Sequence, residues 1–288
     1  MPPPPRCHFR RLRRSTAGPA LPAAEVINSG CTIVVGPGAK LAVKEIAVNF
    51  AGPLTIRSPG NAAVMFKKAP WRATSVSIAL PGSNSELISK ESRLAATAGN
   101  VAISVGDMLS GLLNGASVQA GAGIAIRVGA ESSLKLSQSD LLGGSSPITI
   151  AGTGPKVALD LGQGTFRSTA GFSVVVATRD SSIAIKDGTF DAGAGSILLQ
   201  AGASTLTIQA GILGTAMVDD VQLDGRMGVL VHTSGRGSTL VKNSRGSSLS
   251  EIAVRGRAVG VCVAEGFSFS APDVVLCPSP LPGIQPPF

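Results

Sequence analysis

Short runs of alternating apolar and small or polar residues recur along most of this chain. Two of these runs lead to the same tripeptide, since Gly164-Thr165-Phe166 returns 24 residues later as Gly188-Thr189-Phe190. Both copies follow alternating aliphatic residues, at 157–161 and at 183–185. Alternation with a period of two places the aliphatic side chains on one face of an extended strand. The pattern therefore predicts short β-strands that repeat at a fixed interval.

The repeat also has a constant internal spacing. Five residues separate the last aliphatic residue of the alternating run from the next large apolar residue in four places: Leu136 to Leu141, Leu161 to Phe166, Ile185 to Phe190 and Ile208 to Leu213. Each repeat contains a second predicted strand, at 124–128, 148–150, 172–176 and 197–199. We therefore expect Leu161, Ile185 and Ile208 to lie directly over one another in successive coils.

These patterns predict an all-β fold, a single right-handed parallel β-helix (β-solenoid) with about 24 residues and three short strands per coil. Stacked coils pair each strand in parallel with its copy, about 4.8 Å away. A β-sandwich is the alternative, because its strands are also short and frequent. The fixed interval favours the solenoid, and so does the scarcity of Asp-Gly hairpin turns, which occur only at 187–188 and 224–225.

Proline marks the expected ends of the solenoid, because it cannot donate to a β-ladder. The last seventeen residues contain six prolines, from Pro272 to Pro287. We therefore expect a basic Pro/Arg-rich tail or targeting segment at 1–24, the β-helix domain at 25–266 and a Pro-rich C-terminal tail at 267–288. Two stretches inside the domain, 85–96 and 107–113, also fit short helices, although the second equally fits a strand of its coil.

Composition agrees with a narrow interior. Aromatic residues are only 3% of the 288 residues, whereas apolar residues make up 44% and glycines number 36. Large aromatic side chains usually anchor a compact core, so stacked aliphatic side chains are expected to fill this one. The formal charge is +8, but five arginines precede the first acidic residue, Glu25, which leaves about +3 for the rest. This distribution does not favour nucleic-acid binding, and no apolar run is long enough to span a membrane.

The N-terminal segment and the cysteines bear on localisation. The stretch 15–24 is too short and too rich in proline for the apolar region of a secretory signal peptide, so an organellar transit segment or a wrongly assigned start stays open. Among the four cysteines, Cys262 and Cys277 are the candidate disulfide pair at one end, with Cys7 and Cys31 at the other. Disulfides would indicate an oxidising compartment, and free buried thiols are the alternative.

The phrase at 183–190, alternating aliphatic residues followed by Asp-Gly-Thr-Phe, resembles the repeats of known right-handed parallel β-helix proteins. These are the pectin-lyase-like proteins and the passenger or haemagglutinin-like parts of surface adhesins. The resemblance covers about residues 118–213 and is one of repeat style, without a family-specific catalytic motif. It implies the β-helix fold and does not by itself assign a function, because one fold hosts many functions. Adhesion or carbohydrate contact by a secreted or cell-surface protein is the expectation that such proteins suggest.

An enzymatic alternative follows from the same resemblance, because polygalacturonase-like β-helices use clustered aspartates and a histidine on one face. The matching cluster here is Asp219, Asp220, Asp224 and His232. Two carboxylates can act as acid and base when their environments differ. However, Val231 and Thr233 flank the histidine where that family has glycines, and adjacent residues of a strand point to opposite faces. Aspartates that cap turns are the simpler interpretation.

A basic stretch offers a binding surface instead. Between 226 and 257 a single acidic residue, Glu251, accompanies six basic ones: Arg226, Arg236, Lys242, Arg245, Arg255 and Arg257. Residues one coil apart align into a row, and a basic row can bind an anionic polysaccharide or another cell-surface anion. Charge that serves solubility is the alternative.

The sequence therefore predicts a non-catalytic extracellular or surface β-helix that mediates adhesion or contacts anionic glycans. A carbohydrate-active β-helix enzyme, a polysaccharide hydrolase or lyase, is the alternative. No metal or cofactor is expected, because the aspartates form no converging set of ligands in the repeat.

Overall fold

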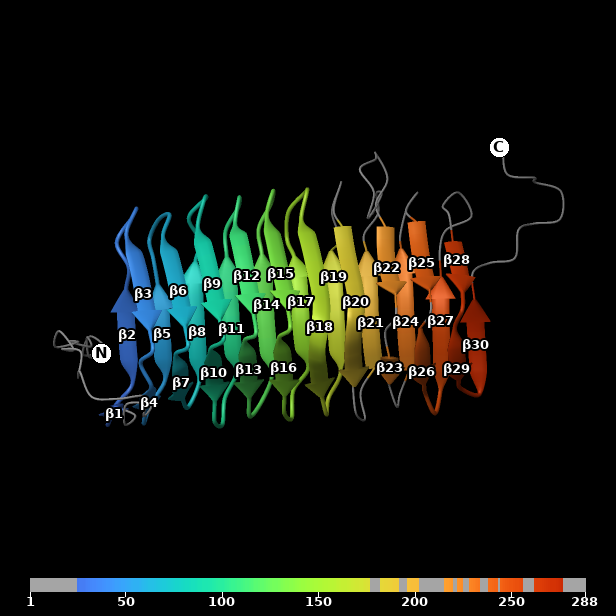
Figure 1. Cartoon of the computed structure of the whole chain (residues 1–288), viewed down its shortest axis with the longest axis horizontal. Helices are drawn as coiled ribbons and strands as arrows, with labels where there is room; N and C mark the ends of the chain where they lie inside the picture. Colours follow the sequence, from blue (N-terminus) through green and yellow to red (C-terminus); the bar gives the residue numbers. More distant parts are fainter. Residues whose placement is uncertain are drawn as a thin grey trace.

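The computed structural model describes residues 25–176, 182–191, 196–201, 215–219, 222–224, 228–233, 238–242, 244–255 and 262–276. Every regular element in these ranges is a β-strand, and all the strand pairs are parallel. The strands wind into an elongated solenoid whose coils follow one another along its long axis (Figure 1). The predicted fold class is thus confirmed, and both stretches that also fitted helices form strands instead.

One side of the solenoid is an eleven-stranded sheet, called sheet A here. It consists of β2 (Cys31–Val34), β5 (Leu54–Arg57), β8 (Val76–Leu80), β11 (Val101–Val105), β14 (Ile124–Val128), β17 (Ile148–Gly152), β19 (Phe172–Val176), β21 (Ser196–Ala201), β24 (Gly228–Thr233), β27 (Glu251–Arg255) and β30 (Asp273–Leu276).

The other side is a bent sheet, sheet B, whose two arms meet at a corner in each coil. Its first arm contains β3 (Lys40–Lys44), β6 (Ala63–Lys67), β9 (Glu86–Lys90), β12 (Ser110–Asn114), β15 (Ser133–Ser137), β22 (Thr215–Asp219), β25 (Ser238–Lys242) and β28 (Cys262–Glu265). Its second arm contains β1 (Glu25–Ile27), β4 (Val48–Phe50), β7 (Pro70–Ala73), β10 (Arg93–Ala96), β13 (Ser117–Ala120), β16 (Asp140–Gly143), β23 (Gln222–Asp224), β26 (Arg245–Ser247) and β29 (Ser268–Ser270). Two long strands, β18 (Ala158–Ser168) and β20 (Ser182–Asp191), run through both arms.

The register confirms the repeat that the sequence predicted. Leu161 pairs with Ile185, and Gly164, Thr165 and Phe166 pair in order with Gly188, Thr189 and Phe190. Residues that are paired in register on successive strands form a column along the axis. The side chains of one inward-facing column in sheet A are each no more than 2% exposed: Ile56, Ile78, Ile103, Ile126, Ile150 and Val174. Burial of each such side chain stabilises the fold by about 1.5–3 kcal/mol, so these columns form the core.

One register prediction is wrong. The residue after Ile185 in its column is Val218 of β22, not Ile208. The chain therefore advances 33 residues between these two coils, where the repeat predicted 23. The phrase at 206–213 has the alternation of a strand but lies outside the described residues. Alternation alone does not reveal an insertion between coils, because the inserted residues can follow the same pattern.

The first described strand, β1, starts at Glu25, and described strands continue beyond residue 266, the predicted end of the domain. Strands β29 and β30 follow that position, and β30 pairs with β27 as the last described strand of sheet A. Pro272 lies between these two strands, where no ladder hydrogen bond is required of it.

In the coils from β3 to β18, one left-handed residue turns the chain at the corner between the arms of sheet B. Its φ lies between 45° and 56° at five non-glycine positions: Glu45, Lys68, Glu91, Gln138 and Gln163. A non-glycine residue rarely adopts this conformation, so the surrounding stack must hold it there. At the first four of these positions the amide donates to a carbonyl of the next coil, as Lys68 does to Lys90 at 3.0 Å and Glu91 does to Asn114 at 2.9 Å.

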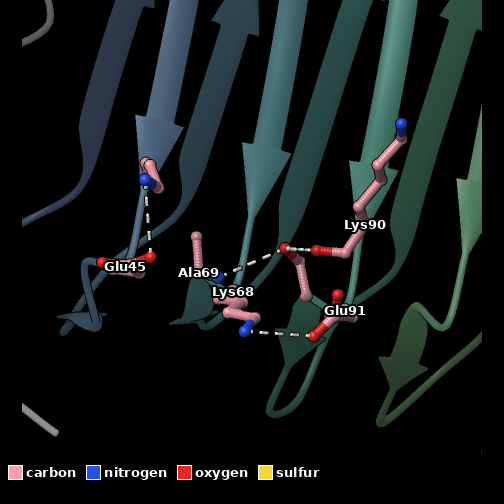
Figure 2. A network of polar contacts seen from close by, with 7 residues as sticks. Glu45, Lys68, Ala69, Lys90 and Glu91 are labelled. Atoms are coloured by element: carbon pink, nitrogen blue, oxygen red, sulfur yellow. Dashed lines mark hydrogen bonds and ion pairs between the residues drawn. The ribbon is translucent and has the colours of Figure 1, made fainter. Parts of the chain in front are cut away.

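Buried serines complete these corners. Between the arms of sheet B, Ser92 and Ser139 follow the left-handed residue in alternate coils, and both are no more than 4% exposed. At the corner between sheet A and the first arm of sheet B, Ser85 and Ser132 follow the left-handed Asn84 and Glu131 and are equally buried. Each hydroxyl accepts a hydrogen bond from an amide of the preceding coil and donates to a carbonyl of its own coil. In one example, Ser92 accepts from the Ala69 amide at 3.2 Å and donates to the Lys90 carbonyl at 2.8 Å. In Figure 2 these two bonds are the dashed lines that end at Ala69 and at Lys90.

A pair of substitutions in β11 tests the assignment of inward and outward positions. Ile103→Asp places an unpaired carboxylate in the aliphatic column and should lower the free energy of unfolding by roughly 3 kcal/mol or more. Ser104→Asp adds the same charge at an exposed position of the same strand and should change it by less than about 0.5 kcal/mol. Thermal melts of the two variants measure the difference, and equal melting temperatures would contradict the assignment.

Two serine-to-alanine substitutions should have opposite signs. Ser139→Ala leaves the buried Ala116 amide without its acceptor and should cost about 1–3 kcal/mol. The hydroxyl of Ser89 is buried without any hydrogen-bond partner, so Ser89→Ala should stabilise the protein by about 1 kcal/mol. Denaturant midpoints measure both effects, and destabilisation by both variants would refute this account of the buried hydroxyls.

Candidate functional site

The residues predicted for an enzymatic site lie on three sides of one coil. Asp219 is the last residue of β22, Asp224 the last of β23, and His232 lies in β24 of sheet A. Asp220 lies outside the described residues. The structure therefore brings no two of the three located residues onto one strand. Within the described ranges, no group of three or more His, Cys, Asp or Glu residues is arranged to hold a metal ion.

The predicted basic stretch is also divided among the sides of the solenoid. Lys242 lies in β25, Arg245 in β26 and Arg255 in β27, so each belongs to a different column. The neighbours of Lys242 in its column are acidic, Asp219 on one side and Glu265 on the other. The other three members, Arg226, Arg236 and Arg257, lie outside the described residues. The members that the structure describes form no common row.

The cysteine predictions are located only in part. Cys31 begins β2, is 2% exposed and is disulfide-bonded. Cys262 begins β28, whereas Cys7 and Cys277 lie outside the described residues. The expected pair of Cys262 and Cys277 thus stays a prediction.

A row of lysines that the sequence analysis missed runs along the first arm of sheet B. Lys44, Lys67 and Lys90 are the last residues of β3, β6 and β9, and they are paired in register on three successive coils. All three side chains are exposed. Neighbouring strands of a sheet lie about 4.8 Å apart, so this lysine row carries one positive charge for each coil. In the sequence, the row is marked only by the constant spacing of 23 residues between its lysines. This spacing is recognised once the coil positions are known.

The corner of sheet B fixes the backbone under the lysine row. The carbonyl of Lys67 accepts from the amide of the left-handed Glu45 at 2.9 Å, and the Lys90 carbonyl accepts from the Lys68 amide. Because Val43 and Phe66 before these lysines point into the core, the lysine side chains must point outward. Their positions thus depend on the rigid stack rather than on a loop.

Positive charge exceeds negative charge around this row. Lys44 pairs with Glu45 at 3.7 Å and Lys68 pairs with Glu91 at 3.5 Å, both at exposed positions where an ion pair contributes little. Lys67 and Lys90 form no ion pair with any residue that the structure describes. Figure 2 shows the Lys90 side chain extending away from the pair of Lys68 and Glu91.

Two arginines add to the positive charge across the corner. Arg72 of β7 and Arg93 of β10 are exposed on the second arm of sheet B, and the Arg93 guanidinium donates to the Gln119 amide oxygen. From residue 40 to residue 93 the chain contains eight basic and three acidic residues. The first coils of the solenoid therefore present the strongest positive surface among the described residues.

An aliphatic row runs beside the lysine row. It consists of outward-facing residues two positions earlier on each strand, paired in register: Ala42, Met65, Ile88 and Leu112. The last three are half-buried and Ala42 is exposed. This surface therefore offers an apolar strip and a line of ammonium groups side by side, with the same spacing along the axis.

Comparison with protein-family models, with curated proteins and with solved structures finds no match to this chain. The likeness to pectin-lyase-like proteins is therefore one of repeat style alone. No helix in the described part of the chain is long and apolar enough to cross a membrane.

The lysine row should destabilise the fold slightly, because like charges directly opposite on neighbouring strands repel. Lys67→Ser removes the middle charge and should raise the free energy of unfolding by about 0.5 kcal/mol at low salt, with the gain disappearing at high salt. Lys135→Ser is the matched control, since Lys135 is exposed and pairs with Asp160 at 2.9 Å. Melting temperatures at two ionic strengths measure both, and the control should show no gain at low salt.

Proposed function

We propose that this protein is a non-catalytic secreted or surface β-solenoid that contacts anionic glycans through the lysine row. The observation that carries the proposal is the in-register placement of Lys44, Lys67 and Lys90, with no ion-pair partner for the last two among the described residues. Point charges on a rigid surface attract a polyanion over about one Debye length, about 10 Å at 0.1 M salt. Several weak contacts made at once then add up along a polymer.

The surroundings of the row favour a glycan over a nucleic acid. Single-stranded nucleic acids bind basic grooves in which aromatic side chains stack on the bases. Here the nearby aromatic residues Phe50, Phe66 and Trp71 are at most 5% exposed and pack into the core. Trp71 contacts both phenylalanines edge-on, at 5.5 and 5.2 Å between ring centroids. The surface therefore offers ammonium groups and aliphatic atoms and no stacking platform.

Two further observations support the remaining parts of the proposal. Asp219, Asp224 and His232, the residues of the enzymatic alternative, belong to three different sides of their coil. The disulfide bond of Cys31 is typical of a protein that folds in an oxidising compartment, which supports a secreted or surface location.

Binding to immobilised polygalacturonate, hyaluronan and heparin tests the proposal. The affinity should fall with rising salt, and the triple variant Lys44→Ser/Lys67→Ser/Lys90→Ser should lose about tenfold or more at low salt. The matched control removes three exposed charges that are paired in the structure, Lys135, Lys156 and Arg167, by substitution with serine. It should change the affinity by less than about twofold.

The outcomes are distinct. Binding that does not respond to salt, or equal losses in the two triple variants, would contradict a role for the lysine row. The variant Arg255→Glu/Arg257→Glu belongs in the same assay, because it tests the C-terminal basic stretch that the sequence suggested. A loss confined to that variant would move the binding site to the last coils.

A further inference from the structure

The lysine row and the aliphatic row are two parallel lines on one face, and together they describe a ligand more closely than charge alone. We infer that they form a linear track for an acidic polysaccharide that lies along the solenoid axis. Its acid groups lie against Lys44, Lys67 and Lys90, and the C–H faces of its sugar rings lie on the aliphatic row. The inference rests on the proposed function and specifies the chemistry and the direction of the ligand.

The register sets the direction. Residues in one column are separated by about 4.8 Å along the axis, so the three lysines span about 10 Å and the four aliphatic residues about 14 Å. Residues two apart on a strand lie about 6.6 Å apart, so the two rows are roughly one sugar ring apart. A polymer that ran along the strands, at right angles to the axis, would meet at most one member of each row.

The structure also limits the length of the track. After Lys90 its column continues with Asn114 and Ser137, which carry no charge. After Leu112 the aliphatic column continues with Lys135, whose ammonium group is paired with Asp160 at 2.9 Å. The lysine row therefore ends at β9 and the aliphatic row ends at β12, so both rows end before β15. The track occupies the coils of β3, β6, β9 and β12.

The aliphatic row distinguishes a sugar from other polyanions. A pyranose ring has an apolar face of C–H groups, which can cover half-buried side chains such as Met65, Ile88 and Leu112 and exclude water from them. Inorganic polyphosphate has charges and no apolar face, so it can use the lysine row alone. The contribution of the aliphatic row to affinity should therefore depend on the chemistry of the ligand.

The test removes the aliphatic row and keeps the lysines. Met65→Ser/Ile88→Ser should weaken binding of polygalacturonate and hyaluronan by about fivefold, and should leave polyphosphate binding within about twofold of the wild type. The control Val34→Ser/Val175→Ser replaces two outward-facing valines of sheet A and should leave the binding of all three ligands within that twofold range. Melting temperatures establish that each variant is folded.

A second variant tests the row without altering the aliphatic residues or the net charge. Lys67→Ser/Ser133→Lys moves one ammonium group to an exposed position on β15. If the row acts as a track, this variant loses polysaccharide affinity about as strongly as Lys67→Ser alone. If only total charge matters, the relocated lysine restores it.

Equal losses for polysaccharides and polyphosphate in the aliphatic variant, no loss for either, or full restoration by the relocated lysine would overturn the track. The proposed function would survive each of these results, provided that the lysine triple variant still loses affinity. Absence of salt-sensitive binding of the wild-type protein to any acidic polysaccharide would instead refute the proposed function itself.

Discussion

The structure depends on parallel pairing in register between consecutive coils. Each inward side chain is covered by the corresponding side chain of the next coil, as Leu161 is by Ile185, and a one-residue slip would exchange the two faces of a strand. The same pairing orders the outer surface. Any residue type that repeats at the coil interval becomes a continuous row, whether or not that row contributes to stability. A solenoid therefore converts a weak sequence periodicity into a regular surface.

The corners maintain this register while the coil length varies from one turn to the next. Successive strands of sheet A are offset by 22 residues from Leu54 to Val76 and by 25 from Val76 to Val101, yet both pairs remain in register. A left-handed residue turns the chain at the corner of sheet B, and a buried serine in alternate coils satisfies the amide below it. These polar contacts specify where each coil bends, which the aliphatic columns alone do not.

The charges of the middle and of the first coils are arranged differently. In the middle, opposite charges lie one coil apart and pair, as in Glu131 with Lys156, Lys135 with Asp160 and Arg167 with Asp191. In the first coils Lys68 and Glu91 pair in the same way, but three lysines also occupy one column and repel one another. A row of like charges that opposes stability is typical of a binding site, which is why the proposed function centres on it.

The sequence by itself determined the fold class, because alternation fixes which face of a strand is buried and the repeat of Gly-Thr-Phe fixes the stacking of two coils. It did not determine the position of β22, since the stretch at 206–213 alternates as a strand does and only the ladder selects Val218 as the neighbour of Ile185. The candidate site was decided by the same ladder. Lys242, Arg245 and Arg255 are close in sequence but lie on three sides of the coil, whereas Lys44, Lys67 and Lys90 are distant in sequence and adjacent in space. Local alternation sets the direction of a side chain, but its neighbours are set by hydrogen bonds between coils, which only the tertiary structure contains.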